Sequence, residues 1–205
     1  MISVHILVKA DRSIDYEEKL SRCIDSLKNQ PIDLKLYDHI EDNVGLARSK
    51  AIQKSKSEWI SWVDPDDYVV DEGFSHCWNL IQQEPKCSAV YTNHWIAADN
   101  VKKRTWFSEL SPNIGYSQQH QMHHLVIYNK KVIEPELKFI EGTKTKYKTL
   151  LNLAAIYHGK VIGTKEPFYV WNEDGNQNHL RHSFKDNPQI WHERVHKYRK
   201  HILKK

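Results

Sequence analysis

Hydrophobic and polar positions near the N-terminus follow the pattern of a strand, a helix and a second strand. Residues 3–8 are rich in β-forming side chains, and residues 14–29 repeat apolar side chains at the spacing of one helix face. Ser13 stands where an N-cap is expected, and a second short strand is predicted at residues 34–37, closing at Asp38. This order predicts a βαβ unit whose two strands are parallel.

A continuous apolar run at residues 59–63 follows a predicted helix at residues 43–55. Such a run is typical of a parallel strand that is buried on both faces. It ends abruptly in the carboxylates of Asp64, Asp66 and Asp67. Because ligands bind beyond the carboxyl ends of the strands in open α/β sheets, we expect these acids to lie at a ligand site.

The rest of the chain has a weaker pattern. Strands are predicted at residues 88–92, 101–106, 125–128, 161–164 and 167–171, and helices at residues 77–83, 147–158 and 191–205. Residues 172–178 are polar and are expected to form a loop. We find neither an internal repeat nor a low-complexity linker.

The composition is that of a folded protein. The chain has 205 residues, of which 40% are hydrophobic and 11% aromatic, enough for one large domain or two small ones. No run approaches the length of a membrane span, and the N-terminus lacks the hydrophobic stretch of a signal peptide. We therefore expect a soluble, cytoplasmic protein.

The cysteines argue against a disulfide framework and against a thiolate zinc site. Cys23, Cys77 and Cys87 are odd in number and include no Cys-x-x-Cys pair. We expect reduced, partly buried thiols.

The charge is uneven along the chain. Its net charge is +4. Residues 181–205 contain eight Lys or Arg against Asp186 and Glu193, a local charge of 8 − 2 = +6, so the remaining residues carry 4 − 6 = −2. A basic C-terminal segment can attract anionic lipid headgroups or a nucleic-acid backbone, or can be a solvated helix without a partner.

The acidic cluster has two interpretations from its residues alone. Asp64 and Asp66 are separated by one proline of fixed φ and can turn their oxygens toward one hard cation, magnesium or manganese, which can bridge phosphate oxygens. In the other interpretation the residues form an Asp-Pro-Asp-Asp turn, with Asp66 or Asp67 capping the next helix.

Three motifs follow one another along the chain: Asp38 after the second strand, Asn43-Val-Gly-Leu-Ala-Arg48, and Asp64-Pro-Asp-Asp67. In this order they resemble the nucleotide-binding half of GT-A glycosyltransferases, in particular the large inverting family 2 that includes bacterial glycan-building enzymes and polysaccharide synthases. The resemblance implies a single GT-A-like, Rossmann-related α/β domain with a mostly parallel central sheet flanked by helices. Its expected parts are a nucleotide-sugar-binding half at residues 1–92, an acceptor-side half at residues 93–178 and the basic segment at residues 179–205.

The resemblance also implies a function and a donor site. The chain is expected to transfer a sugar from a nucleotide-sugar, with UDP-sugars as the expected donors, to an acceptor hydroxyl with inversion. A manganese or magnesium ion held by Asp66, with Asp64 nearby, would neutralise the diphosphate leaving group. The other expected donor-site residues are Val8 and Ala10 beside the base, Asp38 at the base or ribose, and Asn43, Gly45, Arg48 and Asp64 toward the phosphates.

The sequence identifies the catalytic base less clearly than the donor site. Family members supply a carboxylate from a Glu-Asp pair at a helix start, which deprotonates the acceptor hydroxyl. Here the corresponding stretch contains Glu141, but lysines and threonines follow it. Either Glu141 is the base, or Asp67 or the Glu173-Asp174 pair supplies it, or the chain has lost activity. Glu141 can equally be an acid that only precedes a helix.

Histidines offer further ligands. The family often has a histidine after a closing aromatic strand, and the resemblance points to His179 as a contact for the metal or the diphosphate. A neutral imidazole can ligate a cation, although a loop histidine can also be solvated. His120, His123 and His124 could instead suggest zinc, but we favour an acceptor-side or surface position for them.

The sequence leaves several acceptors possible. A glycan is the family default, and Trp95, Trp106, Trp171 and Trp191 can stack on sugar rings or can be core residues. The basic C-terminal segment suggests DNA as a second acceptor, as in bacteriophage enzymes that glycosylate modified bases, in which case the protein would work in the host cytoplasm. The chain could also be an inactive nucleotide-sugar-binding module, or a metal-dependent nuclease, although a nuclease leaves residues 43–48 unexplained.

Overall fold

The structure is a computed structural model that describes residues 1–9, 13–39, 43–98, 101–104, 122, 124–141, 143, 147–172, 193, 195–198 and 200–201. The strands are β1 (Ile2–Lys9), β2 (Ile32–His39), β3 (Trp59–Trp62), β4 (Tyr68–Val69), β5 (Ala89–Ala98), β6 (Val101–Arg104), β7 (Val126–Asn129) and β8 (Val161–Asn172). The helices are α1 (Ile14–Asp25), α2 (Val44–Lys54), α3 (Gly73–Gln83), α4 (Lys130–Ile133), the 3-10 helix η2 (Glu134–Glu136), α5 (Leu137–Ile140) and α6 (Tyr147–His158). The predicted α/β class is confirmed.

One mixed sheet runs through the molecule in the order β2-β1-β3-β7-β5-β8-β4, with β6 paired to β5. The predicted βαβ unit is present, because β1 pairs in parallel with both β2 and β3. The expectation of a mostly parallel sheet was wrong in detail, since β7 lies antiparallel between β3 and β5, and β6 and β4 also pair antiparallel. Because β7 joins the strands of both predicted halves, the described strands form a single domain.

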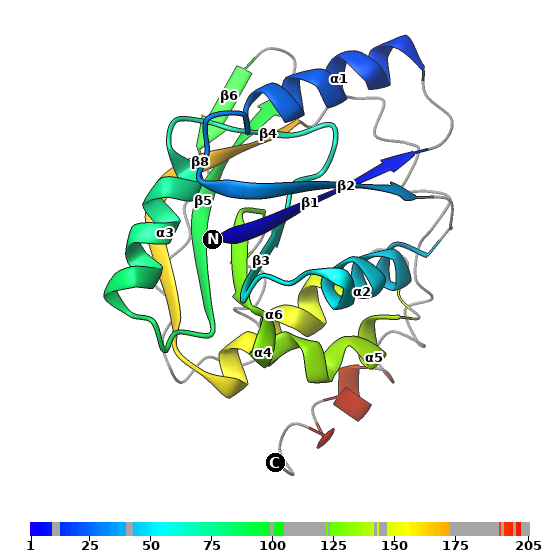
Figure 1. Cartoon of the computed structure of the whole chain (residues 1–205), viewed down its shortest axis with the longest axis vertical. Coiled ribbons are helices and arrows are strands. Elements are labelled where there is room, and N and C mark those ends of the chain that lie inside the picture. The colour runs from blue at the N-terminus through cyan, green and yellow to red at the C-terminus, as the bar shows by residue number, and fades with distance from the viewer. Residues whose placement is uncertain are drawn as a thin grey trace.

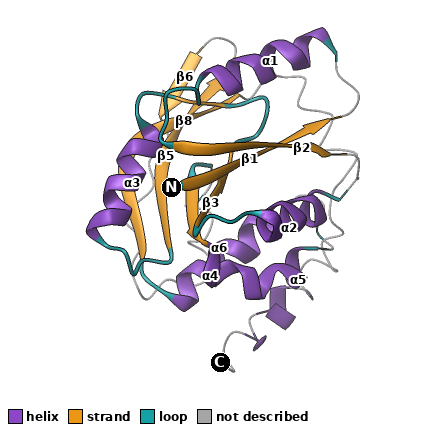
Figure 2. Cartoon of the chain, in the orientation of Figure 1, coloured by secondary structure: helices purple, strands orange, loops and turns teal. Residues whose placement is uncertain are grey.

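Helices cover both faces of this sheet (Figures 1 and 2). On one face, Ile6 and Val8 of β1 share a buried cluster with Cys23 of α1 and Phe74 of α3. On the other face, buried side chains of β3, β5 and β7 pack with those of α2, α5 and α6. Alternate residues of a strand point to opposite faces, so each central strand contributes to both cores.

The segment between β7 and α6 holds helical turns that periodicity did not predict. Helices α4, η2 and α5 follow one another directly after β7. Each is only three or four residues long, too short to show a helical repeat in the sequence. Figure 1 shows these turns beside α2 and α6, so they bring the chain back to the start of α2.

Part of the basic C-terminal segment is helical and docked. Residues 195–198 are helical, and Val195 and Tyr198 are buried. The ring of Tyr198 lies 4.8 Å from that of Phe139 in α5. The described part of this segment is therefore packed against the domain, unlike the fully solvated helix considered from the sequence.

The structure describes all three cysteines and shows the length and apolar character of the helices. Cys23, Cys77 and Cys87 are free, as predicted, and they are fully buried where partial burial was expected. Among the described residues, no helix combines the length and apolar character that crossing a bilayer requires.

Buried polar groups of β1 lie on the face that α2 covers. His5 is fully buried, and its Nε2 lies 3.1 Å from Oγ of Ser3. The ring also makes an edge contact with Tyr37, at 5.3 Å between centroids. Burial, together with the nearby Arg48 guanidinium, lowers the pKa of His5 to about 3. The folded protein therefore holds His5 neutral.

This burial predicts a loss of stability in mild acid. Between pH 6.5 and about 3 the unfolded chain protonates His5 and the folded chain does not, so the free energy of unfolding falls as the pH falls through that window. By pH 5 the contribution of His5 is about 2 kcal/mol. Urea unfolding of the wild type and of His5→Gln across this range measures it. The free energy of unfolding of His5→Gln is expected to depend less steeply on pH than that of the wild type. His196→Gln, at an exposed site, is the control and should match the wild type. An equally steep pH dependence in His5→Gln and the wild type would contradict a buried, neutral His5.

Candidate functional site

The carboxyl ends of the parallel strands β1, β2 and β3 form one edge of the sheet, seen in Figure 1. Val8 of β1 lies in register with Asp38 of β2, and Val63 donates a backbone hydrogen bond to the carbonyl of His5. Asp38 is exposed and Val8 is buried in the core, so only the backbone of Val8 is available beside a ligand. Asp64 follows at the same edge, as the sequence predicted.

The acidic residues form a tight turn after β3. The amide of Asp67 donates to the carbonyl of Asp64 at 3.0 Å, with Pro65 in the position that prolines favour in such turns. The predicted turn and the predicted ligand site are thus the same structure. The side chain of Asp66 is partly exposed, while Asp67 is 2% exposed.

Strand β8 anchors the turn through Asp67. The Tyr169 hydroxyl donates to one carboxylate oxygen of Asp67 at 2.7 Å, and the amide of Asn172 donates to the other at 2.9 Å. The side-chain amide of Asn172 also donates to the carbonyl of Asp66. The structure therefore gives Asp67 an anchoring role, and its alternative role as the base stays a prediction.

Burial and mutual repulsion disfavour the ionised acids. Burial raises the pKa of Asp67 well above its ordinary value, and the carboxylates of Asp66 and Asp64 raise it further. Burial and the Asp64 carboxylate also raise the pKa of Asp66. The turn therefore needs positive charge nearby to hold its acids ionised.

Arg48 of α2 supplies part of that charge. The residue is 1% exposed, and one guanidinium nitrogen donates to Oδ1 of Asp64 at 2.9 Å while another donates to the carbonyl of His5 at 3.1 Å. The guanidinium also lies over the rings of Trp62 and Tyr147, at 5.4 and 5.9 Å from their centroids. Arg48 thus joins α2, β1, β3 and α6 at the site.

Lys148 of α6 supplies a further part of that positive charge, and sequence reasoning missed this residue. Its Nζ lies 3.1 Å from Oδ2 of Asp64, and its side chain is 22% exposed. Burial lowers the pKa of Lys148, but the Asp64 carboxylate more than offsets this, so the net pKa is raised. The lysines that the sequence shows where an acid was expected are Lys144 and Lys146, and nothing in the sequence indicated that Lys148, just after them, reaches Asp64.

The Asn-x-Gly motif holds the loop before α6. Asn43 caps α2 by accepting from the amide of Leu46 and donates its side-chain amide to the carbonyl of Glu141 at 2.7 Å. The amide of Gly45 donates to the carbonyl of Thr143, and a Cβ on Gly45 would lie 2.0 Å from the carbonyl oxygen of Ile140. Both residues have a packing role, which leaves their predicted contact with the phosphates a prediction.

Glu141 is held beside α2. Its carboxylate accepts a hydrogen bond from the Ser49 hydroxyl at 2.8 Å, and it is partly buried. Ser49 follows Arg48 on α2, so one helix holds both the predicted base and the ion pair of Asp64. The role of base stays a prediction.

Three potential metal ligands come together, and the set differs from the one predicted. Asp64, Asp67 and His124 each place one ligand atom within 4.8 Å of the others. His124 is 5% exposed and its ring stacks on Tyr169, so it is neither a surface residue nor far from the acids. The predicted set shares only Asp64 with this group: Asp66 is not in it, and His179 lies outside the described residues.

The present arrangement of these side chains does not fit a divalent cation. Both oxygens of Asp64 are ion-paired, one with Arg48 and one with Lys148, and both oxygens of Asp67 accept hydrogen bonds. At about 4 Å a divalent ion and a single positive charge repel by roughly 8 kcal/mol at an effective dielectric constant of about 20. Two cations therefore cancel the attraction of two carboxylates at that distance. An ion fits only if Lys148 leaves Asp64.

Several predicted residues cannot be placed. Ala10, Glu173, Asp174, His120, His123, Trp106 and Trp191 lie outside the described residues. Trp95 and Trp171 are partly exposed on the neighbouring strands β5 and β8. The Trp171 ring lies 5.1 Å from that of His124, so an aromatic surface borders the buried end of the acidic turn.

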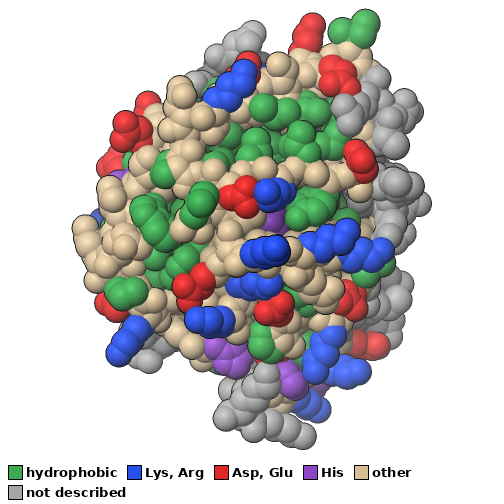
Figure 3. All heavy atoms as spheres, in the orientation of Figure 1, with side chains coloured by type: hydrophobic (Ala, Val, Ile, Leu, Met, Phe, Trp, Pro, Cys, Tyr) green, Lys and Arg blue, Asp and Glu red, His purple; other side chains and the backbone are tan. Residues whose placement is uncertain are grey.

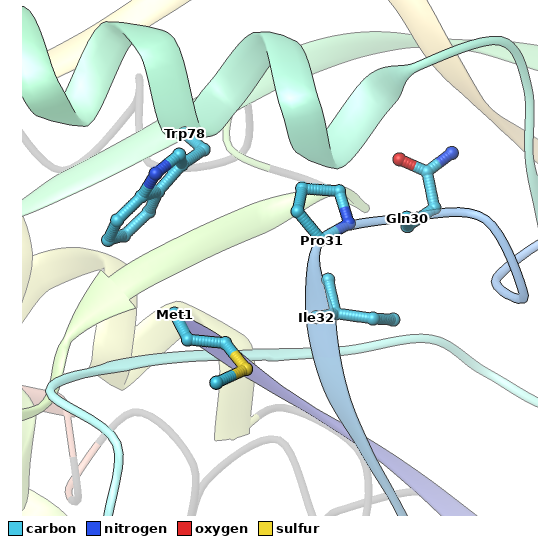
Figure 4. A pocket seen from close by; sticks show the side chains of 5 residues that line it. All are labelled: Met1, Gln30, Pro31, Ile32 and Trp78. Atoms are coloured by element: carbon cyan, nitrogen blue, oxygen red, sulfur yellow. The ribbon is translucent and has the colours of Figure 1, made fainter.

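A hollow at the other end of the strands is not this site. It has a volume of about 320 Å³ and is lined by Met1, Gln30, Pro31, Ile32 and Trp78 (Figure 4). Met1 and Ile32 stand at the amino ends of β1 and β2, away from Asp64. None of the five side chains that line this hollow is charged, so no side chain there matches the charge of a diphosphate.

The surface over α2 carries exposed side chains of both charge signs. Figure 3 shows Lys and Arg side chains gathered there with acidic side chains among them. Lys50 and Lys54 of α2 are exposed, whereas Arg48 of the same helix is buried in the site. The cation that binds Asp64 from α2 is therefore separate from this surface.

Together, the βαβ unit, the acidic turn after β3 and the paired arginine define a GT-A-type nucleotide-binding fold. The chain belongs to glycosyl transferase family 2, whose model matches residues 5–137, more than half of the chain.

Among the matching solved structures, S. aureus TarS 1-349 in complex with UDP-GlcNAc aligns with a TM-score of 0.74 at 14% identity, covering 96% of this chain and 65% of that one. The same fragment with UDP aligns with a TM-score of 0.66 at 14% identity, covering 83% of this chain and 60% of that one. The chain thus spans less than two thirds of these relatives, and the likeness shows the fold. The comparison with curated proteins found no match.

The two neighbouring acids are predicted to differ in their effect on stability. Asp67→Ala leaves the Tyr169 hydroxyl and the Asn172 amide without their acceptor and should lower the free energy of unfolding by about 2 kcal/mol. Asp66→Ala removes a partly exposed carboxylate and one source of repulsion, and should change it by less than about 0.5 kcal/mol. Chemical denaturation of both variants measures this difference. Equal destabilisation would show that Asp67 does not anchor the turn.

Proposed function

We propose that the chain binds a nucleoside diphosphate sugar, with a UDP-sugar as the expected donor, and transfers the sugar to an acceptor hydroxyl with inversion. The observation that carries this proposal is the acidic turn at the carboxyl end of β3, with Asp64 ion-paired to Arg48 and Lys148. A donor of this kind carries a diphosphate whose negative charge grows as its bond to the sugar breaks, and cations beside it stabilise that charge. The TarS complexes with UDP-GlcNAc and UDP support the choice of uracil as the base.

The nucleoside would lie at the ends of β1 and β2. Asp38 is exposed there and is in register with Val8, so its carboxylate can accept hydrogen bonds from a ribose or a base. The diphosphate would then extend from this edge toward Asp64, Arg48 and Lys148. This orientation follows the rule that ligands of open α/β sheets lie beyond the carboxyl ends of the strands.

In the transfer step, Glu141 is the proposed base. It takes the proton of the acceptor hydroxyl, the oxygen attacks the anomeric carbon from the face opposite the diphosphate, and the bond to the diphosphate breaks. One bond forms on one face as the other breaks on the opposite face, which inverts the configuration. Asn43 and Ser49 of the α2 region hold the Glu141 loop and carboxylate in place. A glycan is the proposed acceptor.

A manganese or magnesium ion is the cofactor that the family resemblance implies. Asp64, Asp67 and His124 are the residues that could hold it, and it would add positive charge at the diphosphate. It would have to displace Lys148 from Asp64. Donor titrations with and without the ion are therefore part of the test of function.

A nucleotide-sugar-binding module without transferase activity is the second candidate. It is favoured by one observation: the first turn of α6, where the family supplies an acid, contains none, and Lys148 stands there. Turnover of a bound donor separates this candidate from the transferase.

If Asp38 contacts the nucleoside, its loss should weaken binding of UDP, and loss of another acid on β2 should not. Asp38→Ala should weaken binding of UDP by about tenfold, because one charged hydrogen bond to the nucleoside is lost. Asp33→Ala on the same strand, whose carboxylate pairs with Lys35, is the matched control and should bind as the wild type does. Calorimetric titration of both variants measures the difference. Unchanged affinity in Asp38→Ala would remove Asp38 from the donor site.

If Glu141 is the base, replacing it should lower turnover without weakening donor binding. Glu141→Gln should keep UDP-sugar affinity within about twofold and lower turnover by at least a hundredfold, because the base is lost while the hydrogen bond from Ser49 is retained. Release of UDP from UDP-GlcNAc, with and without glycan acceptors, reports turnover. Glu134→Gln, in the same segment but partly exposed, is the control. An active Glu141→Gln variant would place the base elsewhere.

A further inference from the structure

We propose that Lys148 takes the place of a divalent cation at the diphosphate, so that the chain binds its nucleoside diphosphate without metal. This inference rests on the proposed donor site and adds the source of its positive charge. It starts from the contact of the Lys148 ammonium with Oδ2 of Asp64, at 3.1 Å. A metal ion held by this oxygen of Asp64 would lie close to the ammonium and would be repelled by it.

The charges around Asp64 support the same conclusion. Its single negative charge faces the guanidinium of Arg48 at 2.9 Å as well as the ammonium of Lys148. These two cations already pair with both oxygens of Asp64, so a divalent ion beside Asp64 would be repelled by both of them. Arg48 is 1% exposed and is bound to the carbonyl of His5, so it is fixed in the site.

Lys148 is the cation that can reach a ligand. Its side chain is 22% exposed, whereas that of Arg48 is 2% exposed. An ammonium has three donors, so Lys148 can keep its contact with Asp64 and still donate to phosphate oxygens. Its flexible stem allows this without movement of the backbone.

The position of Lys148 in α6 adds to the positive potential. Lys148 is the second residue of a helix of 12 residues, and the first turn has no acidic side chain. The amino end of a helix carries a partial positive charge, which disfavours a lysine there unless an anion lies close. In this structure Asp64 is that anion, and a diphosphate beside it would be stabilised by both the helix end and the ammonium.

The experiment is calorimetric titration of the full chain with UDP, in a chelating buffer and in manganese. Lys148→Met removes the charge and keeps much of the side-chain volume, while Lys148→Arg keeps the charge. Lys131→Met is the matched control, because Lys131 is also in an ion pair, with Glu58, but is 81% exposed and away from Asp64. Thermal unfolding of each variant shows that it is folded under the titration conditions.

The proposal predicts that wild-type UDP affinity is the same within about twofold in chelator and in manganese. Lys148→Met should bind UDP at least tenfold more weakly in chelator, which is the loss of one charged contact. Lys148→Arg should keep most of the affinity, and Lys131→Met all of it.

Three results would overturn the proposal and leave the donor site standing. One is wild-type binding of UDP that requires manganese. The second is a Lys148→Met variant whose affinity for UDP in chelator is unchanged. The third is a Lys148→Met variant whose affinity for UDP in manganese exceeds that of the wild type, since the lysine would then compete with the metal. Failure of the wild type to bind UDP in either buffer would instead contradict the proposed function itself, and this inference with it.

Discussion

The buried ion pair between Arg48 and Asp64 is the interaction on which the rest of the site depends. A guanidinium that is 1% exposed has lost nearly all of its water, and it is stable there only because Asp64, the carbonyl of His5 and two aromatic rings replace that water. Removing Asp64 would leave a buried charge without its counterion. The pair therefore fixes the end of β3 against α2 and keeps the acidic turn in one position.

The acidic turn is also held from its other side. Strand β8 reaches it through Tyr169 and Asn172, which bind the Asp67 carboxylate. Helix α6 reaches it through Lys148, and α1 through Arg22, which donates to the carbonyl of Asp66 at 3.3 Å. Elements from the whole length of the chain thus converge on four residues. Such a site can present partly exposed acids and cations to a ligand while its supporting shell stays rigid.

Sequence reasoning located this site but not its surroundings. The strands β1 and β3, the helix α2 and the position of Asp64 follow from local patterns, because apolar periodicity and turn residues act over a few neighbouring positions. Helix α6 was predicted with its observed bounds, Tyr147–His158, for the same reason. In contrast, the contacts of Tyr169 and Lys148 with the acidic turn join residues far apart in the sequence, and no local pattern marks them.

The same difference explains what sequence reasoning left undecided. A motif alone could not tell whether Asp67 faces a ligand or the core, and its burial depends on where β8 ends. His124 belongs to a stretch with no clear periodicity, yet it lies against Tyr169 and near Asp67. The mixed character of the sheet comes from the antiparallel strands β4, β6 and β7, and β7 pairs with strands far away in the sequence, which no local pattern marks.

The most direct test of this account is a crystal structure of the chain with UDP bound in a chelating buffer. The account predicts the diphosphate at the ends of β1 and β3, with the Lys148 ammonium within hydrogen-bond distance of a phosphate oxygen and Arg48 still paired with Asp64. A diphosphate bound elsewhere, or a Lys148 side chain turned away from both Asp64 and the phosphates, would contradict it.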